Sequence, residues 1–115
     1  MKVIIAGSRD CNSFTLVCQA IKESGFIISE VVSGTARGID KTGEYWAMQN
    51  NIPIKEFIPN WDLYGKSAGI MRNLKMADYA DALIAIWDYK SPGTKHMIKC
   101  AKKKDLKIFI LPIME

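Results

Sequence analysis

The sequence predicts an α/β fold, a three-layer sandwich in which helices cover both faces of a five-stranded parallel sheet. Short apolar runs, typical of buried strands, alternate with longer amphipathic stretches, typical of helices. Most of the apolar runs are nearly continuous, as expected for parallel strands that are buried on both faces. Because right-handed crossovers leave few topologies, we expect the strand order 3-2-1-4-5. We expect one domain that covers residues 1–115.

Apolar runs and helix-capping residues predict the first three elements. The run Lys2–Ala6 predicts the first strand. Asn12 or Ser13 can cap the first helix, and Gly25 can end it in a left-handed conformation. The inward face of this helix is expected to carry Leu16, Val17, Ala20 and Ile21. The second strand is expected around the β-branched residues 31–32.

The middle of the chain predicts a helix, a strand and a further helix. A second helix is expected over about Ile39–Asn50, with a third strand at Ile54–Ile58. Residues 59–65 are expected to be irregular, and a third helix follows over about Ser67–Ala77. Its inward face is expected to carry Ala68, Met71, Leu74 and Ala77.

The last three elements follow the same alternation. Ala82–Trp87 is almost wholly apolar and predicts the fourth strand, after which residues 88–94 form a loop. The fourth helix is expected over about Lys95–Lys103, and Lys107–Leu111 is the last strand. The inward residues of this helix are expected to be Met97, Ile98 and Ala101.

Composition excludes several classes of protein. With 49% apolar and 24% charged residues, the chain matches a soluble globular protein. No apolar run could span a bilayer and no signal peptide opens the chain, so we expect a cytoplasmic protein with no membrane partner. The three cysteines and His96 lack metal-ligand spacing, so we predict neither a metal nor a cofactor.

The charge balance favours an anionic partner, because the net charge is +4. Much of the excess lies near the C-terminus, in a run that is more typical of a solvated helix face than of a nucleic-acid patch. The residues of this run are Lys99, Lys102, Lys103, Lys104 and Lys107.

The segment 33–40 is the feature around which the chain is organised. It predicts a strand, a glycine-rich turn and a helix start. Gly34 and Gly38 allow backbone to approach a ligand closely, and a helix N-terminus with Arg37 beside it favours an anion such as phosphate. A tight connection that merely needs glycine explains the same pattern, and the turn alone does not separate the two interpretations.

Four segments with small residues, hydroxyls or cations are expected at the carboxyl edge of the sheet. Ligands bind at this edge where the strand order reverses, here between strands one and four. Standard dinucleotide and Walker A signatures are absent. The candidate ligand-binding residues are Gly7, Ser8, Arg9, Ser33, Gly34, Thr35, Ala36, Arg37, Gly38, Asp40, Arg72, Asn73, Trp87, Ser91, Gly93 and Thr94.

These segments together resemble the SLOG superfamily, which joins the DNA-processing protein A family with the Lonely-guy-type nucleotide phosphoribohydrolases. The resemblance covers residues 2–111 and is strongest to the small single-domain YspA-like members. It implies a Rossmann-like fold and a pocket for nucleotides or nucleotide-derived ligands. The segments that carry it are Gly7-Ser8-Arg9, Ser33-Gly34-x-Ala36-Arg37-Gly38-Ile39-Asp40, Ala68-Gly69-x-x-Arg72-Asn73 with Met76 and Asp81 following, and Ser91-x-Gly93-Thr94.

The resemblance also implies that the usual catalytic acid is missing. The glutamate of the phosphoribohydrolases falls on Met97, which cannot accept a proton, whereas Arg72 matches a family arginine. Asp40 and Glu44 share a helix face, where they can contact a ribose, form a solvated pair, or supply the acid. Asp88, just past the fourth strand, is a further candidate for the acid. Aromatic residues that could stack on a base are Trp61, Tyr64, Trp87 and Tyr89.

Three functions are therefore open. The first is a binding module, expected as a homo-oligomer, that senses or sequesters a nucleotide-derived small molecule such as an ADP-ribose derivative or a cyclic nucleotide. By analogy, a phage protein that removes an immune signal would act in this way. The second is an enzyme that cleaves a nucleotide N-glycosidic or phosphate bond. The third is a single-stranded DNA-binding protein, which the Lys-rich run supports.

Overall fold

A parallel sheet of five strands forms the centre of the molecule in a computed structural model that describes residues 1–113. The strand order is β3-β2-β1-β4-β5, and every neighbouring pair is parallel, which confirms the predicted topology. The strands are β1 Lys2–Gly7, β2 Glu30–Ser33, β3 Ile54–Glu56, β4 Ala82–Trp87 and β5 Lys107–Pro112.

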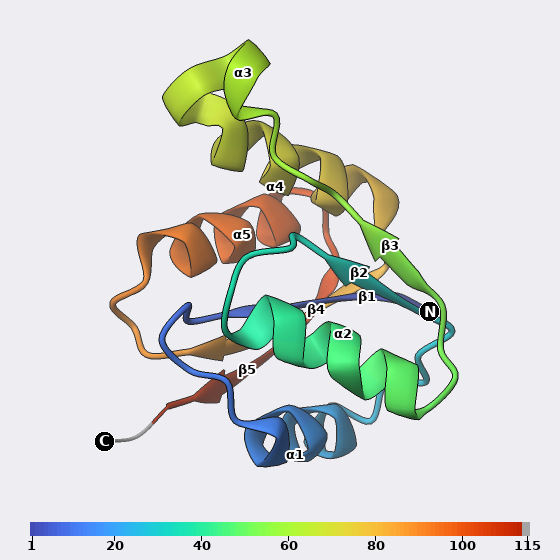
Figure 1. Cartoon of the computed structure of the whole chain (residues 1–115). Helices are drawn as coiled ribbons and strands as arrows, with labels where there is room; N and C mark the ends of the chain where they lie inside the picture. The colour runs from blue at the N-terminus through green and yellow to red at the C-terminus, as the bar shows by residue number, and fades with distance from the viewer. Residues whose placement is uncertain (114–115) are drawn as a thin grey trace.

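Helices cover both faces of this sheet (Figure 1). The pair α1 and α2 lies on one face and the pair α4 and α5 on the other, which confirms the Rossmann-like three-layer sandwich. Within residues 1–113, no helix has the length and apolar character needed to cross a membrane. The helices are α1 Phe14–Ser24, α2 Ile39–Gln49, the short α3 Trp61–Tyr64, the 3-10 turn η1 Gly65–Ser67, α4 Ala68–Tyr79 and α5 Pro92–Lys103.

The residues of β1 show why its apolar run is continuous. Val3 and Ile5 pack in the cluster beneath α1 and α2, whereas Ile4 and Ala6 pack in the cluster beneath α4 and α5. Successive side chains of a strand point to opposite faces, so a strand between two helical layers needs apolar residues at every position. β4 is buried on both faces in the same way.

The ends of α1 follow the local chemistry of the sequence. The Ser13 hydroxyl oxygen accepts a hydrogen bond from the Leu16 N–H at 3.2 Å, and Gly25 adopts a left-handed conformation with φ of 70°. These contacts satisfy backbone groups that a helix end leaves without partners. Both predicted caps are confirmed.

Several predicted boundaries need correction. Residues 59–65 are not wholly irregular, because the Asn60 side chain accepts from the Leu63 N–H at 3.0 Å and begins α3. Strand β3 is shorter than predicted and ends at Glu56. Helix α4 covers Ala68–Tyr79 rather than 67–77. Helix α5 begins at Pro92 rather than Lys95, since proline is favourable in the first turn.

The prediction that Leu74 faces inward was wrong. Leu74 is 39% exposed, whereas Asn73, Met76 and Ala77 are buried. In a helix with 3.6 residues per turn, Leu74 lies about 100° around the axis from Asn73 and falls on the solvent side. The inward face of α4 is therefore partly polar.

Gly38 is where the loop after β1 meets the start of α2. Its φ is +80°, and a Cβ atom there would lie 2.4 Å from the Ser8 carbonyl oxygen. The Ile39 N–H donates to that same oxygen at 3.2 Å. Only glycine permits this approach, which draws the start of α2 against the carboxyl edge of the sheet.

We predict that Gly38→Ala lowers the free energy of unfolding by roughly 3 kcal/mol or more, since it combines a disfavoured φ with a backbone clash. Gly25→Ala is the matched control, because Gly25 also has a positive φ but a Cβ atom there would meet no other atom within 4 Å. It should cost only about 1–2 kcal/mol. Equal losses for the two variants in urea denaturation would contradict the close approach.

Candidate functional site

A cleft of about 520 Å³ opens at the carboxyl edge of the sheet, between the loops that follow β1, β2 and β4 and the helices α4 and α5. Its floor is apolar and its rim carries charges of both signs. The lining residues are Ala6, Gly7, Arg9, Asp10, Ala36, Arg37, Asp40, Arg72, Asn73, Met76, Asp88, Lys90, Ser91, Pro92, Gly93, Thr94 and Met97.

Most of the predicted ligand-binding residues meet in this cleft. Those that line it are Gly7, Arg9, Ala36, Arg37, Asp40, Arg72, Asn73, Ser91, Gly93 and Thr94. The predicted residues that do not line it are Ser8, Ser33, Gly34, Thr35, Gly38 and Trp87. Several of these shape the turns, since Ser8 Oγ accepts from the Asp10 N–H and Ser33 Oγ accepts from the Thr35 N–H.

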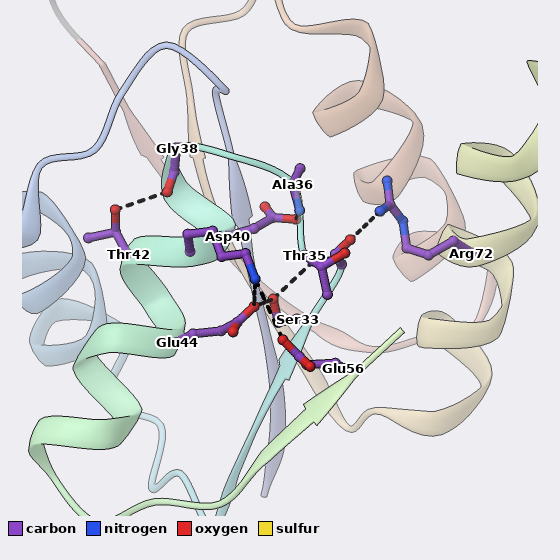
Figure 2. Close-up of polar contacts among 11 residues, drawn as sticks. Ser33, Thr35, Ala36, Gly38, Asp40, Thr42, Glu44, Glu56 and Arg72 are labelled. Carbon is purple, nitrogen blue, oxygen red and sulfur yellow. Dashed lines mark hydrogen bonds and ion pairs between the residues drawn. The ribbon is translucent and has the colours of Figure 1, made fainter. Parts of the chain in front are cut away.

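Arg72 connects α4 to the turn between β2 and α2 (Figure 2). Its Nη1 donates to the Gly34 carbonyl oxygen, and its Nε donates to Asn73 Oδ1 at 2.9 Å. Burial lowers the pKa of Arg72, although nearby Asp40 favours its charged form. Among residues 1–113, its hydrogen bonds go to these two acceptors, so its other N–H groups remain available to a bound anion.

Asp40 is a buried carboxylate that lines the same cleft, only 6% exposed. Its Oδ2 accepts from the Ala36 N–H at 3.2 Å. Burial raises the pKa of Asp40 to about 6, and this rise is opposed by Arg72 and by the N–H groups of Ala36 and Gly7. Asp40 therefore changes its charge near neutral pH.

Gly34 provides the space in which Asp40 and Arg72 approach the turn. A Cβ atom on Gly34 would lie 2.9 Å from Arg72 Nη1 and 2.9 Å from Asp40 Oδ2. Any side chain at this position must displace at least one of the two charged groups. The glycine that was expected to let a ligand approach thus serves the protein's own charged side chains.

The structure gives different surroundings to Asp40 and Glu44, the two acids expected to share a helix face. The Ser33 hydroxyl donates to Glu44 Oε2 at 2.5 Å, and Lys41 Nζ lies 3.5 Å from Glu44 Oε2 and 3.6 Å from Glu56 Oε2 (Figure 2). Burial is the largest effect that raises the pKa of Glu44. Glu44 belongs to a cluster beside β2 and does not line the cleft, whereas Asp40 does.

The N-terminus of α5 forms one wall of the cleft. Ser91, Pro92, Gly93 and Thr94 all line it, and no side chain caps the first turn of the helix. Asp88 holds the preceding loop by accepting from the N–H groups of Lys90 and Ser91, which lower its pKa. The positive end of the helix dipole therefore faces the cleft.

The aromatic residues proposed for stacking lie outside the cleft. Trp87 packs against Tyr89 with ring centroids 4.4 Å apart and donates to the Ser91 carbonyl oxygen at 3.2 Å. Tyr64 lines a separate hollow of about 290 Å³, and Trp61 is exposed. Trp87 thus supports the loop that carries Ser91.

Sequence reasoning missed several lining residues. Asp10 and Lys90 belong to the loops after β1 and β4, and Pro92 begins α5. Their position just after the ends of these strands was the available signal for them. Ala6, Met76 and Met97 form apolar floor, and no sequence pattern separates such residues from ordinary core. Met97 is 1% exposed and is as buried as a core residue.

Comparison with known proteins agrees with this architecture. Residues 1–64 match the model of the YspA, cpYpsA-related SLOG family. The chain belongs to this family. It is 31% identical over 119 residues to the Gene 61 protein of Mycobacterium phage D29, and the match covers 93% of each protein. The resemblance to the SLOG superfamily noted from the sequence is confirmed.

A solved structure shares the fold of this SLOG family member. DNA processing protein A (DprA) from Streptococcus pneumoniae superposes with a TM-score of 0.79 and 21% sequence identity over 98% of this chain. The match covers 50% of the DprA chain, so this protein spans half of that structure. At this identity the likeness concerns the fold alone.

We predict that Asp40 makes stability depend on pH. Its folded pKa lies above the unfolded value of 3.8, so its contribution is fully present below that pH and is lost as pH rises through about 6. Asp40→Asn removes this loss. In urea denaturation, its free energy of unfolding relative to wild type should rise by up to about 3 kcal/mol between acidic and neutral pH.

Asp88→Asn is the control for this experiment, because the pKa of Asp88 is lowered rather than raised. This variant should lose stability relative to wild type as the pH rises from acid to neutral. The assignment of Asp40 fails if both variants change in the same direction.

Proposed function

We propose that this protein binds a nucleotide-derived small molecule of the ADP-ribose or cyclic-nucleotide type, and senses or sequesters it. The observation that carries the proposal is the cleft itself, which combines Arg9, Arg37, Arg72 and Lys90 with an uncapped helix N-terminus. Its volume of about 520 Å³ lies in the ordinary range of small-molecule sites. Family membership supports a ligand of this kind.

The phosphate in this proposal lies between the N-terminus of α5 and the guanidinium of Arg72. Backbone N–H groups at a helix start and a planar arginine are the donors that proteins use for phosphate. Thr94, buried and on the cleft wall, adds a hydroxyl. The turn 34–38 completes the anion side of the site through Ala36 and Arg37.

The sugar in this proposal meets Asp40. An ionised carboxylate accepts hydrogen bonds from two neighbouring hydroxyls, as a ribose presents them. The burial of Asp40 excludes the interpretation of a solvated surface acid. The apolar floor formed by Ala6, Met76 and Met97 suits the uncharged face of a sugar or base.

Binding without cleavage is the version of this function that we favour. Met97 offers neither a proton nor a charge to stabilise an oxocarbenium ion, and Glu44 does not line the cleft. The similarity to a phage protein supports a role in which the ligand is held and withheld from other receptors.

Binding of single-stranded DNA is the competing function. Two lysines of the run that favoured it, Lys102 and Lys103, lie in the last turn of α5, whereas the cleft lies at its first turn. Twelve helical residues separate these ends by about 18 Å. A DNA strand bound across both would give a steep dependence of affinity on salt, and one small ligand would not.

We predict that Arg72→Ala lowers the affinity for ADP-ribose by about ten- to a hundredfold in calorimetry, because it removes a charge-assisted hydrogen bond to phosphate. Lys102→Ala, which removes a cation far from the cleft, should bind like wild type. Loss of affinity in Lys102→Ala with no loss in Arg72→Ala would instead support a nucleic-acid surface.

We predict that the ligand is recovered intact. Purified protein incubated with AMP, ADP-ribose, NAD or cyclic ADP-ribose should yield no product over many molar equivalents, as resolved by chromatography, because no acid replaces the missing glutamate. Multiple turnovers that disappear in Asp40→Asn would overturn this view and identify Asp40 as the acid. Turnovers that disappear in Glu44→Gln alone would identify Glu44 as the acid.

A further inference from the structure

The side-chain amide of Asn73 is wholly engaged by protein groups. Its Oδ1 accepts from Arg72 Nε at 2.9 Å, and its Nδ2 lies 3.0 Å from His96 Nδ1 and 3.4 Å from the Gly93 carbonyl oxygen. Asn73 is 4% exposed. It therefore connects Arg72 to the N-terminal half of α5 even though it lines the cleft.

These contacts fix which group donates and which accepts in each hydrogen bond that links Arg72, Asn73 and His96. Arg72 Nε can only donate, so the oxygen of the amide must face it. The nitrogen of the amide then faces Gly93 and His96, and it can only donate to them. His96 Nδ1 must accept, so a neutral His96 carries its proton on Nε2.

We propose that Asn73 and His96 are positioning residues for Arg72, and that protonation of His96 breaks one of the two hydrogen bonds that hold this arginine in the cleft. A protonated His96 has a donor on Nδ1 that faces the donor Nδ2 of Asn73. If the amide turns over to satisfy His96, its nitrogen faces Arg72 Nε, which is also a donor. Without the turn, a cationic donor faces the donor Nδ2 of Asn73. The turn gives protonated His96 an acceptor but breaks the hydrogen bonds of Asn73 with Arg72 Nε and with the Gly93 carbonyl oxygen.

The surroundings of His96 hold it in the neutral form at physiological pH. Burial lowers its pKa, and the cations Lys99 on its own helix and Arg72 on α4 lower it further. The Cys100 thiol lies 3.5 Å from Nε2, and burial raises the pKa of that thiol, so it adds no negative charge at neutral pH. Only His96 among these groups titrates in mildly acidic solution.

The consequence for the ligand rests on the proposed function, but the positioning of Arg72 does not. Arg72 keeps its bond to the Gly34 carbonyl oxygen when the Nε bond is lost. Its guanidinium then has one anchor instead of two. The expected effect on an anion in the cleft is a reduction in affinity rather than its abolition.

The first test needs no ligand. The exchange of the Arg72 Nε–H with solvent is followed by nitrogen-resolved NMR while the His96 ring signals report its protonation. Exchange of an unprotected guanidinium N–H slows as pH falls, so loss of protection on acidification is distinctive. We expect the protection of this N–H to fall about three- to tenfold as His96 becomes protonated. Constant protection through that titration would overturn the proposal.

Variants separate His96 from Asp40, whose pKa also lies below neutral pH. His96→Gln retains an acceptor that does not titrate, so its Arg72 N–H should stay protected at all pH values tested. Asp40→Asn removes the other titration and should keep the wild-type loss of protection. Cys100→Ala alters the other side of the ring and should also keep it. The same loss in His96→Gln as in wild type would contradict the proposal.

Asn73→Asp gives a second, independent test. A carboxylate accepts from both Arg72 and protonated His96, so the pKa of His96 should rise and the Arg72 N–H should remain protected in acid. Calorimetry with ADP-ribose completes the design. Its affinity should fall about three- to tenfold on His96 protonation in wild type and not in His96→Gln. If ADP-ribose binds neither protein, the proposed function fails while the exchange data still decide the positioning role.

Discussion

The hydrogen bond from Arg72 to the Gly34 carbonyl oxygen is the contact on which the cleft depends. It joins α4, on one face of the sheet, to the turn that starts α2 on the other face. Burying part of a guanidinium is costly unless its donors are used, and here the turn and Asn73 use two of them. The absence of a side chain on Gly34 is what allows the arginine to reach that far. Arg72 thus forms part of the cleft wall and also holds the turn after β2 in place.

Among the described residues, Asp40 and Arg72 carry opposite charges in this region but form no direct ion pair with each other. Asp40 and Arg72 act on each other's pKa, yet each is hydrogen-bonded mainly to backbone or to a neutral amide. Such an arrangement leaves both groups able to exchange part of their interaction for a ligand, because neither must abandon a direct partner of opposite charge. The neighbouring cluster of Glu44, Lys41 and Glu56 is, by contrast, satisfied within itself.

Features that depend on near neighbours in the chain were predictable. Ser13 and Gly25 act within a few residues of themselves, and the sheet order follows from the handedness of crossovers. The turn 33–40 and the loop 91–94 each follow a parallel strand, so both could be assigned to the carboxyl edge of the sheet. The spacing of Asp40 and Glu44 gave no hint of their separation, because their partners Ala36 and Ser33 are set by the turn. Nor could the contact of Asn73 with His96 be predicted, since it depends on how α4 packs against α5. Helix α3 was missed because one turn is too short to show periodicity.

The two edges of the sheet have a consequence for the behaviour of the protein at high concentration. A parallel sheet exposes unpaired backbone groups at its first and last strands, and these can recruit strands from other molecules into aggregates. Strand β3 is only three residues long and presents Lys55 and Glu56 to solvent. Strand β5, at the other edge, ends in Pro112, which has no N–H to offer. Strand addition is therefore disfavoured along the short β3 and at the end of β5 where Pro112 lies.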